Sequence, residues 1–373
     1  MKYCRKCLQP DTRPDEQFTV DVCSSCIAVA DVPSVDWHER HEILEDLLAG
    51  YQRKPGQFFD CILGVSGGKD SVRQALYVRD NLGLTPLLVS LSYPPQQVTP
   101  VGVNNISSLI EQGFDVVVSA PAPETWRRAM RTAFFRFSNF CRSTELALYS
   151  SVPQLALKYQ IPLIFTGENQ SLRDRRTLSD RPWDYNAARN MNTLAGGDLS
   201  WLLESGLDSS RVLPYAYPSV DAFAAGALQI VDLGWFIGDW NNLENGTFSC
   251  AHGLEIRADG VERTGDPLGI SALDEDWVTL NQMIKYYKFG YGKVTDYVNE
   301  DIRMGRGRRD ELIRFVEQYD GACAPDYIES FCDFLQISVA EFWAQVRLSV
   351  NPRLFDVRPD GSIHRRFTVG VGL

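Results

Sequence analysis

Four cysteines near the start of the chain have the spacing of a metal site. Two residues separate Cys4 from Cys7 and Cys23 from Cys26, and fifteen residues lie between the two pairs. In this arrangement two CxxC turns direct four thiolates at one tetrahedral Zn²⁺. Four thiolates leave no open coordination position, so the pattern predicts a structural zinc rather than a catalytic one. Four buried free cysteines are the alternative.

A second motif, SGGKDS, lies between the apolar run DCILGV and a helical pattern. It consists of Ser66, Gly67, Gly68, Lys69, Asp70 and Ser71. Two glycines let the backbone approach a phosphate group, and the N-terminus of the following helix adds its positive end. Lys69 can neutralise phosphate charge, and Asp70 can hold the Mg²⁺ that accompanies a nucleoside triphosphate. The motif is not a Walker A loop, because Gly64 precedes Gly68 by only four positions and an acidic residue follows the lysine.

The segments that must position these residues alternate between apolar runs and helical patterns. The apolar runs are DCILGVS (60–66), TPLLVSLSY (85–93), FDVVVSA (114–120), IPLIFTGEN (161–169) and IVDLGWF (230–236). Helical patterns separate these runs, and one long helical stretch crosses 123–159. Strands joined by such helices need right-handed crossovers, so we predict an α/β fold with a parallel sheet covered by helices on both faces. The site of such a sheet lies at the carboxyl ends of its strands.

Changes of pattern divide the chain into three predicted parts. Residues 1–35 are rich in cysteine and proline and too poor in apolar residues to fold by burial alone, so they are expected to form a zinc ribbon. Residues 36–270 hold the α/β pattern and begin with an amphipathic helix in WHERHEILEDLLAGY. Residues 271–373 are expected to be mainly helical, with a candidate strand in the closing RRFTVGVG.

Composition narrows the class of function. The chain is 44% hydrophobic and 23% charged, which is typical of a folded globular protein. A net charge of −11 predicts long-range repulsion from nucleic acid and favours small-molecule chemistry. No apolar run approaches the roughly eighteen residues that a membrane span needs, and no signal peptide is visible, so a cytoplasmic location is expected.

The motif SGGKDS after a buried strand resembles the PP-loop of the N-type ATP pyrophosphatases. Beyond the loop, the whole chain resembles the N-acetyl sugar amidotransferases of bacterial surface-polysaccharide pathways. This resemblance is carried by YCRKCLQPDTRP with CSSC, by DCILGVSGGKDS followed by LGLTPLLVSLSY, by IPLIFTGEN, and by YYKFGYGKVTDYVNEDIRMGRGRRDE. It implies a PP-loop fold and conversion of an acetamido group on a nucleotide-activated N-acetyl sugar into an acetamidino group. It also implies ammonia from a separate glutaminase complex of glutamine amidotransferase and cyclase-like subunits.

The chemistry itself requires ATP. An amide oxygen is a very poor leaving group, so ammonia does not displace it at neutral pH. Attack of the amide oxygen on the α-phosphate of ATP releases pyrophosphate and leaves an O-adenylyl imidate, from which ammonia expels AMP. A phosphate loop stabilises the departing pyrophosphate electrostatically. ATP and Mg²⁺ are therefore expected ligands, and the cysteine quartet adds a structural Zn²⁺.

Site residues follow from the loop, the predicted strand ends and the resemblance. The candidate catalytic residues are Lys69, Asp70 and Glu168. The candidate ATP-binding residues are Ser66, Gly67, Gly68, Lys69, Asp70, Ser71, Ser92 and Gly167. The candidate substrate-binding residues are Asn169, Lys288, Lys293 and Asp296. Simpler roles remain open: Ser92 as a turn residue, Glu168 as a helix cap, and the lysine-rich motif YYKFGYGKVTD as a surface helix end.

Two other functions remain as alternatives. Some tRNA-thiolating PP-loop enzymes also carry zinc ribbons, but they tend to have a second ribbon and central catalytic cysteines, whereas Cys141 here stands alone. A non-catalytic assembly protein with a decayed loop is the other alternative, and the intact Lys69 and Asp70 argue against it. Measuring the binding of bulk tRNA and its salt dependence would distinguish the tRNA-modifying enzyme from the sugar amidotransferase.

Overall fold

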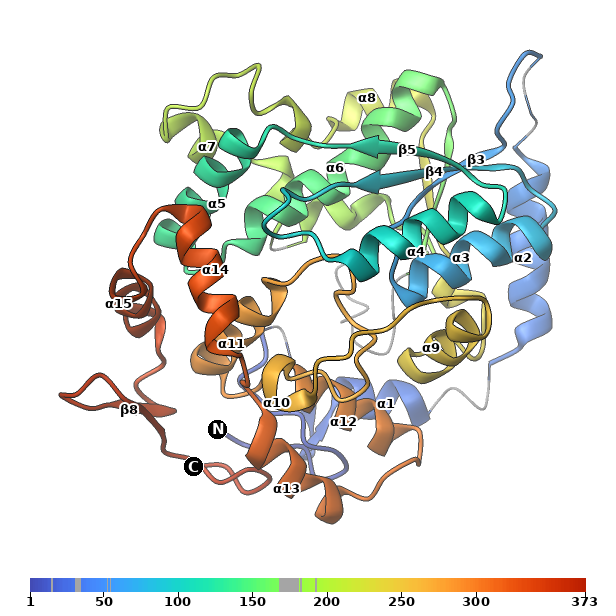
Figure 1. Cartoon of the computed structure of the whole chain (residues 1–373). Helices are drawn as coiled ribbons and strands as arrows, with labels where there is room; N and C mark the ends of the chain where they lie inside the picture. Colours follow the sequence, from blue (N-terminus) through green and yellow to red (C-terminus); the bar gives the residue numbers. More distant parts are fainter. Residues whose placement is uncertain are drawn as a thin grey trace.

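The computed structural model describes residues 1–14, 16–30, 35–51, 53, 55–167, 181, 183–191 and 193–373. Within them, a five-stranded parallel sheet lies at the centre of the α/β part (Figure 1). Its spatial order is β5-β4-β3-β6-β7. The strands are β3 (Cys61–Gly64), β4 (Pro86–Leu91), β5 (Asp115–Ser119), β6 (Leu163–Thr166) and β7 (Gln229–Asp232). Each of the five apolar runs overlaps one strand, and the predicted parallel sheet is confirmed.

Strands β3, β4, β6 and β7 are largely buried, whereas the edge strand β5 is partly exposed. Burial on both faces explains why the inner strands are nearly continuous apolar runs. Ile62 and Ile164 contribute to one apolar core, whereas their neighbours Leu63 and Phe165 contribute to the other. The first core includes residues of α5 (Pro123–Phe137) and α6 (Cys141–Tyr159). Helices α2 (Trp37–Ala49), α3 (Lys69–Asp80) and α4 (Pro100–Glu111) contribute to the second, and α9 (Asn242–Ala251) packs on α3.

The helical stretch predicted across 123–159 is two helices rather than one. Ser138 takes a left-handed conformation with φ of 46° and ends α5, and α6 starts at Cys141. The two helices pack against each other, and α6 also contacts β3, β4 and β6. This break lets both helices contribute to the same core.

The strand order creates a crevice at the carboxyl ends of β3 and β6. After β3 the chain crosses to β4, which lies beside β3 on the side away from β6. After β6 it crosses to β7, which lies beside β6 on the side away from β3. Connections that leave in opposite directions open a space between the strand ends, which is where open α/β sheets bind ligands. The loop Ser66–Ser71 follows β3 directly and so lies at this point.

The C-terminal part is mainly helical, as predicted. Its helices are α11 (Val278–Phe289), α12 (Lys293–Arg303), α13 (Arg309–Tyr319), α14 (Pro325–Leu335) and α15 (Val339–Ser349). The strand expected in RRFTVGVG is wrong as placed: β8 (Phe355–Val357) instead pairs with β9 (Ile363–Arg365). Gly370 and Gly372 have positive φ of 80° and 91°, which is incompatible with an extended strand there.

The N-terminal part forms a small unit against the C-terminal helices. A short hairpin of β1 (Phe18–Thr19) and β2 (Val22–Cys23) leads into α1 (Ser24–Ala30), which lies close to α12 (Figure 1). The remaining short helices are α7 (Ser200–Glu204), α8 (Val220–Gly226) and α10 (Val261–Thr264), with 3-10 turns at Asn186–Asn190, Ala195–Gly197, Leu213–Tyr215 and Leu233–Trp235. None of the helices in the described ranges is both long and apolar enough to cross a membrane. The boundaries near 35 and 270 stay predictions.

Candidate active site

The loop after β3 has the backbone geometry of an anion site. Gly67 has a φ of 77°, and a Cβ at this position would lie 2.8 Å from the Gly102 carbonyl oxygen, so only glycine fits. Gly68 is the N-cap of α3 and provides no side-chain acceptor for the first amide groups of the helix. These amides, with the positive end of a twelve-residue helix, remain available to a phosphate group.

The two charged loop residues are paired and held from α9. Lys69 Nζ lies 2.8 Å from Asp70 Oδ2, and Asn245 Nδ2 donates to Asp70 Oδ1 at 2.6 Å. Ser249 Oγ donates to the Lys69 carbonyl at 2.7 Å. Arg73 donates to Asn245 Oδ1 at 2.6 Å, which fixes the orientation of that amide. Sequence reasoning missed Asn245 and Ser249, because no local motif marks residues that reach the loop from so far along the chain.

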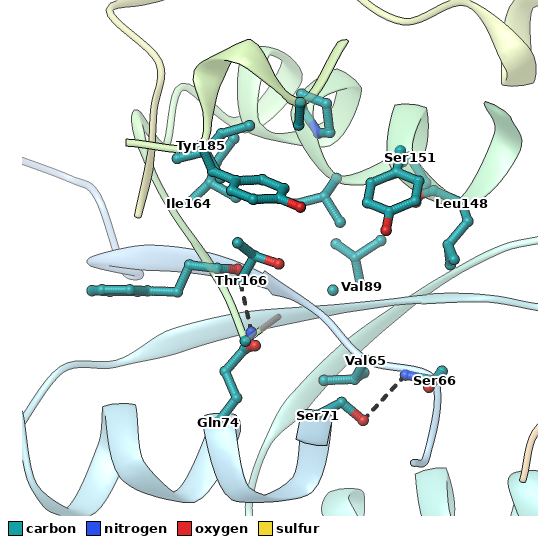
Figure 2. A pocket seen from close by; sticks show the side chains of 18 of the residues that line it. Val65, Ser66, Ser71, Gln74, Val89, Leu148, Ser151, Ile164, Thr166 and Tyr185 are labelled. Atoms are coloured by element: carbon teal, nitrogen blue, oxygen red, sulfur yellow. Dashed lines mark hydrogen bonds between the residues drawn. The ribbon is translucent and has the colours of Figure 1, made fainter. Parts of the chain in front are cut away.

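On one side of the loop lies a cavity of about 250 Å³, shown in Figure 2. Apolar and aromatic side chains form much of its wall, among them Val89, Leu148, Ile164, Tyr185 and Tyr217. Polar groups stand at its loop end, where the Ser66 amide and the Ser71 hydroxyl are hydrogen-bonded at 3.4 Å. A flat aromatic or heterocyclic group with a polar substituent matches such a wall. We name this space the apolar cavity.

Gly167 belongs to the apolar cavity, as the prediction of an ATP-binding role requires. A Cβ at Gly167 would lie 2.5 Å from Trp240 Cζ2 and 2.7 Å from Gln74 Oε1, so the residue allows a close approach of strand and helix. Ser92 is not among the residues that line this cavity, and its hydroxyl donates to the Tyr93 carbonyl at 3.4 Å. Glu168 and Asn169 lie outside the described residues.

On the other side of the loop lies a larger cavity of about 520 Å³, which we name the polar cavity. It shares Ser66, Asp70, Ser71 and Leu148 with the apolar cavity. Its further lining residues are charged or polar in large part: Lys69, Asn242, Arg257, Thr264, Asp266, Ser271, Asp274, Thr279, Gln282 and Lys293. The loop therefore stands at the junction of two cavities of different chemistry.

Lys293 is the predicted substrate residue that the structure brings to the loop. It lines the polar cavity at the first turn of α12, and its ammonium lies 5.4 Å from the centre of the Tyr297 ring. Burial lowers the pKa of Lys293, and the nearby Lys69 ammonium acts in the same direction. Among the interactions of the described residues, none pairs this ammonium directly with a carboxylate. A phosphate group placed between the two lysines would relieve their repulsion.

The other two substrate-binding candidates of the motif YYKFGYGKVTD, Lys288 and Asp296, lie away from the loop. Lys288 Nζ donates to the carbonyls of Phe137 and Ser138 at 2.9 and 2.8 Å, and burial lowers its pKa to about 8. Asp296 is held between Arg13 and Lys285, each at 2.8 Å. Burial alone would raise the pKa of Asp296, but these cations hold it well below its usual range. Neither residue lines the two cavities at the loop.

Sequence reasoning also missed an acidic segment in the wall of the polar cavity. Burial raises the pKa of Asp274 to about 6 and that of Glu275 to about 7. Arg257 holds this segment by donating to the Glu275 carbonyl at 2.5 Å and to Asp276 Oδ1 at 2.7 Å. The Thr99 amide donates to the Asp274 carbonyl at 3.1 Å, which connects the segment to the start of α4. The repeated acidic residues of LDEDW were the only available signal.

The four N-terminal cysteines converge as a metal site. They are buried, and their Sγ atoms all lie within 4.8 Å of one another. Cys4 and Cys26 Sγ are 3.9 Å apart, and Cys7 and Cys23 Sγ are 3.6 Å apart. Tetrahedral zinc–thiolate bonds of about 2.3 Å require S–S separations near 3.8 Å. The Cys23 amide donates to Cys4 Sγ at 3.3 Å, as is typical of the groups that orient metal ligands. The cluster can hold a structural zinc ion.

A magnesium ion has a suitable carboxylate at the loop. Asp70 lines both cavities and its side chain is 34% exposed, so its oxygens are accessible to an ion bound beside a phosphate. An ionised carboxylate can accept about four hydrogen bonds or metal contacts. Lys69 and Asn245 each use one of these acceptor positions on Asp70, so others remain for a metal ion. Asp70 therefore fits the role of magnesium ligand that the sequence predicts.

Comparison with known protein families gives a match for the C-terminal part of the chain. Residues 272–365 match the family model described as LPS biosynthesis protein WbpG-like, C-terminal domain. A comparison with curated proteins found no match. The matched segment contains α11 to α15 and contributes Asp274, Thr279, Gln282 and Lys293 to the wall of the polar cavity. The match supports a relation to a polysaccharide biosynthesis family.

Proposed function

We propose that this chain is an AMP-forming, ATP-dependent amidotransferase that replaces the oxygen of an acetamido group on a nucleotide-activated N-acetyl sugar with ammonia. The observation that carries the proposal is the SGGKDS loop at the junction of an apolar cavity and a lysine-bearing cavity. A nucleoside triphosphate has the same division between an aromatic base and a polyanionic tail. The resemblance to PP-loop pyrophosphatases supports cleavage between the α and β phosphates.

In this proposal ATP spans the two cavities. The adenine occupies the apolar cavity near Tyr185 and Ile164, and the β and γ phosphates bind the loop amides with Lys69 and Lys293. Asp70 would hold Mg²⁺, which draws charge from the phosphate oxygens. Lys69 and Lys293 stabilise the charge that develops on pyrophosphate as it leaves. Because these cations are fixed before reaction, they cost little reorganisation.

The acceptor amide enters the polar cavity beside α11. Its oxygen attacks the α-phosphorus, the bond to pyrophosphate breaks, and an O-adenylyl imidate forms. Ammonia then adds to the imidate carbon, loses a proton, and AMP leaves with the former amide oxygen. The walls of the cavity would keep water from the imidate during this step. The match of 272–365 to an LPS biosynthesis family supports a sugar acceptor, since this segment forms one wall of the cavity.

The tRNA-thiolation alternative is less well supported. A sulfur carrier needs an accessible thiol whose pKa is low enough to give a thiolate. Cys141 is buried, and burial raises its pKa well above the usual value. Burial also raises the pKa of Cys323 to about 12. Among the described residues, no cysteine lines either cavity at the loop.

The test is product analysis with matched variants. Purified protein is incubated with ATP, Mg²⁺, ammonium chloride and a panel of nucleotide-linked N-acetyl sugars, and nucleotides are separated by chromatography. AMP and pyrophosphate should form only with an accepted sugar. Asp70→Ala should lower turnover about a hundredfold or more. Asp80→Ala, at the exposed far end of α3, should have little effect. Sugar-dependent formation of ADP and phosphate would overturn the assignment.

A further inference from the structure

The N-terminal cysteine unit, which we name the ribbon (residues 1–14 and 16–30), is bonded along one side of α12. The α12 residues involved are Asp296, Asn299 and Arg303. Their spacing of three and four positions places them on one face of the helix. The proposed chemistry uses none of these contacts, so they need another explanation.

The first contacts lie toward the N-terminal half of α12. Arg13 Nη1 donates to Asp296 Oδ1 at 2.8 Å, and both side chains are largely buried. The Leu8 amide donates to Asn299 Oδ1 at 2.7 Å, and Asn299 Nδ2 donates to Gln9 Oε1 at 3.3 Å. Asn299 is fully buried, so both ends of its amide are paired with ribbon groups. Polar groups buried in this way hold two elements in one register.

The last contacts lie at the cysteine cluster. Arg303 Nη2 lies 3.7 Å from Cys7 Sγ and 3.8 Å from Cys23 Sγ. Four thiolates around one Zn²⁺ leave a net negative charge, which the Arg303 guanidinium offsets. Without the metal-bound thiolates, the same guanidinium would be a buried cation with a weaker partner. The state of the cysteine cluster thereby affects how firmly the end of α12 is held.

Lys293 connects this face of α12 to the polar cavity. It precedes Asp296 by three positions, so its side chain starts on the same face of the helix. Lys293 and Arg303 are ten positions apart in the helix, a rise of about 15 Å. A helix of this length is stiff, so fixing its C-terminal end and its ribbon face also fixes its first turn. Movement of α12 would shift the Lys293 ammonium relative to Lys69.

We propose that the ribbon is a positioning element for the polar cavity. It holds α12 through Arg13, Asn299 and Arg303, and α12 in turn holds Lys293 where the leaving pyrophosphate binds. The role of the cavity rests on the proposed function, whereas the connection between ribbon and helix does not. Arg13 and Arg303 are positioning residues, since they contact neither cavity.

The experiment uses the whole 373-residue chain with Arg13→Ala, which leaves all four cysteines in place. Three quantities are measured: zinc content, hydrogen exchange of the α12 amides, and pyrophosphate affinity by calorimetry. Zinc content should stay unchanged, α12 should exchange faster, and the Kd for pyrophosphate should rise about tenfold, as expected for one misplaced charged hydrogen bond. Arg13→Lys should restore part of both effects. Arg308→Ala is the control, because its side chain is 73% exposed and pairs with Asp310.

A second arm removes the metal from wild-type protein with a chelator, and the same changes in α12 exchange and pyrophosphate affinity are expected. Unchanged exchange of α12 in both arms would overturn the proposal. Faster exchange with unchanged pyrophosphate affinity would also overturn it, because α12 would then move without affecting the cavity. If wild-type protein does not bind pyrophosphate, the proposed function fails at this cavity, and the exchange data alone decide whether the ribbon holds α12.

Discussion

The buried carboxyl group of Glu275 should make folding stability fall as pH rises. Glu275 is 4% exposed, and its Oε2 accepts hydrogen bonds from Gln97 Nε2 at 3.0 Å and from the Trp277 amide at 2.6 Å. Burial raises its pKa to about 7 from an ordinary value of 4.5, and the adjacent Asp274 carboxylate adds to the shift. The Gln97 side chain also accepts from Trp126 Nε1, so the group lies inside a connected polar network.

The sign and size of the effect follow from proton linkage. Between pH 4.5 and about 7 the folded state binds more protons at Glu275 than the unfolded state does, so the free energy of unfolding decreases as pH rises. The contribution is fully present below pH 4.5 and is lost as pH rises through about 7. At about 1.4 kcal/mol per unit of pKa, the loss is on the order of 3 kcal/mol.

Glu275→Gln removes this titration while keeping an oxygen that can accept from Gln97 and Trp277. Urea unfolding of the variant and the wild type is compared from about pH 4.5 to 8. The stability of the variant relative to the wild type should rise with pH by on the order of 3 kcal/mol. Glu329→Gln removes the same charge from an exposed position and should show a nearly constant difference. A constant difference for Glu275→Gln as well, or one that falls with pH, would refute the reasoning.

Three further predictions concern the site and the metal. Cys23→Ser should lower bound zinc to well under one ion per chain by elemental analysis and lower the unfolding temperature, because the ribbon has little apolar core of its own. Gly167→Ala should weaken ATP binding by about tenfold in calorimetry. The added methyl group would collide with Trp240 and Gln74 and shift the wall of the apolar cavity. Unchanged affinity would contradict a nucleotide in the apolar cavity. The purified chain should form the amidino product with ammonium salts but not with glutamine until a partner glutaminase is added, and efficient glutamine hydrolysis by the chain alone would count against this.

The features predicted well from the sequence are those whose signal is contiguous. Strands buried on both faces appear as apolar runs, and each of the five runs overlaps a strand of the sheet. The cysteine quartet is marked by two local turns, which the fold brings together. The loop Ser66–Ser71 also forms one continuous segment, so its place between β3 and α3 could be read directly.

The motif YYKFGYGKVTD shows why the rest was harder. Gly290 has a φ of 77° and ends α11, and α12 starts at Lys293. The motif is thus divided between two helices, and its charged side chains point to different neighbours. Lys288 contacts carbonyls at the end of α5, whereas Lys293 reaches the polar cavity. The composition of the motif indicates anion binding. Which lysine is available to bind an anion depends on the turn at Gly290, between α11 and α12.

The division of the two cavities along the chain has a consequence for specificity. The apolar cavity is formed by residues between Gly64 and Ile230, all within the α/β part, and its contacts suit a group common to every ATP-dependent reaction. The polar cavity takes much of its wall from 257–293, including α11 and the first turn of α12. In the proposed function the acceptor lies beside α11, which carries Thr279 and Gln282, and the adenine lies in the apolar cavity, which neither residue lines. A substitution at Gln282 or Thr279 should therefore change which acceptor is used more than it changes ATP affinity. In the proposed function the sheet and its loop would supply activation, and the C-terminal helices would determine which acceptor is activated.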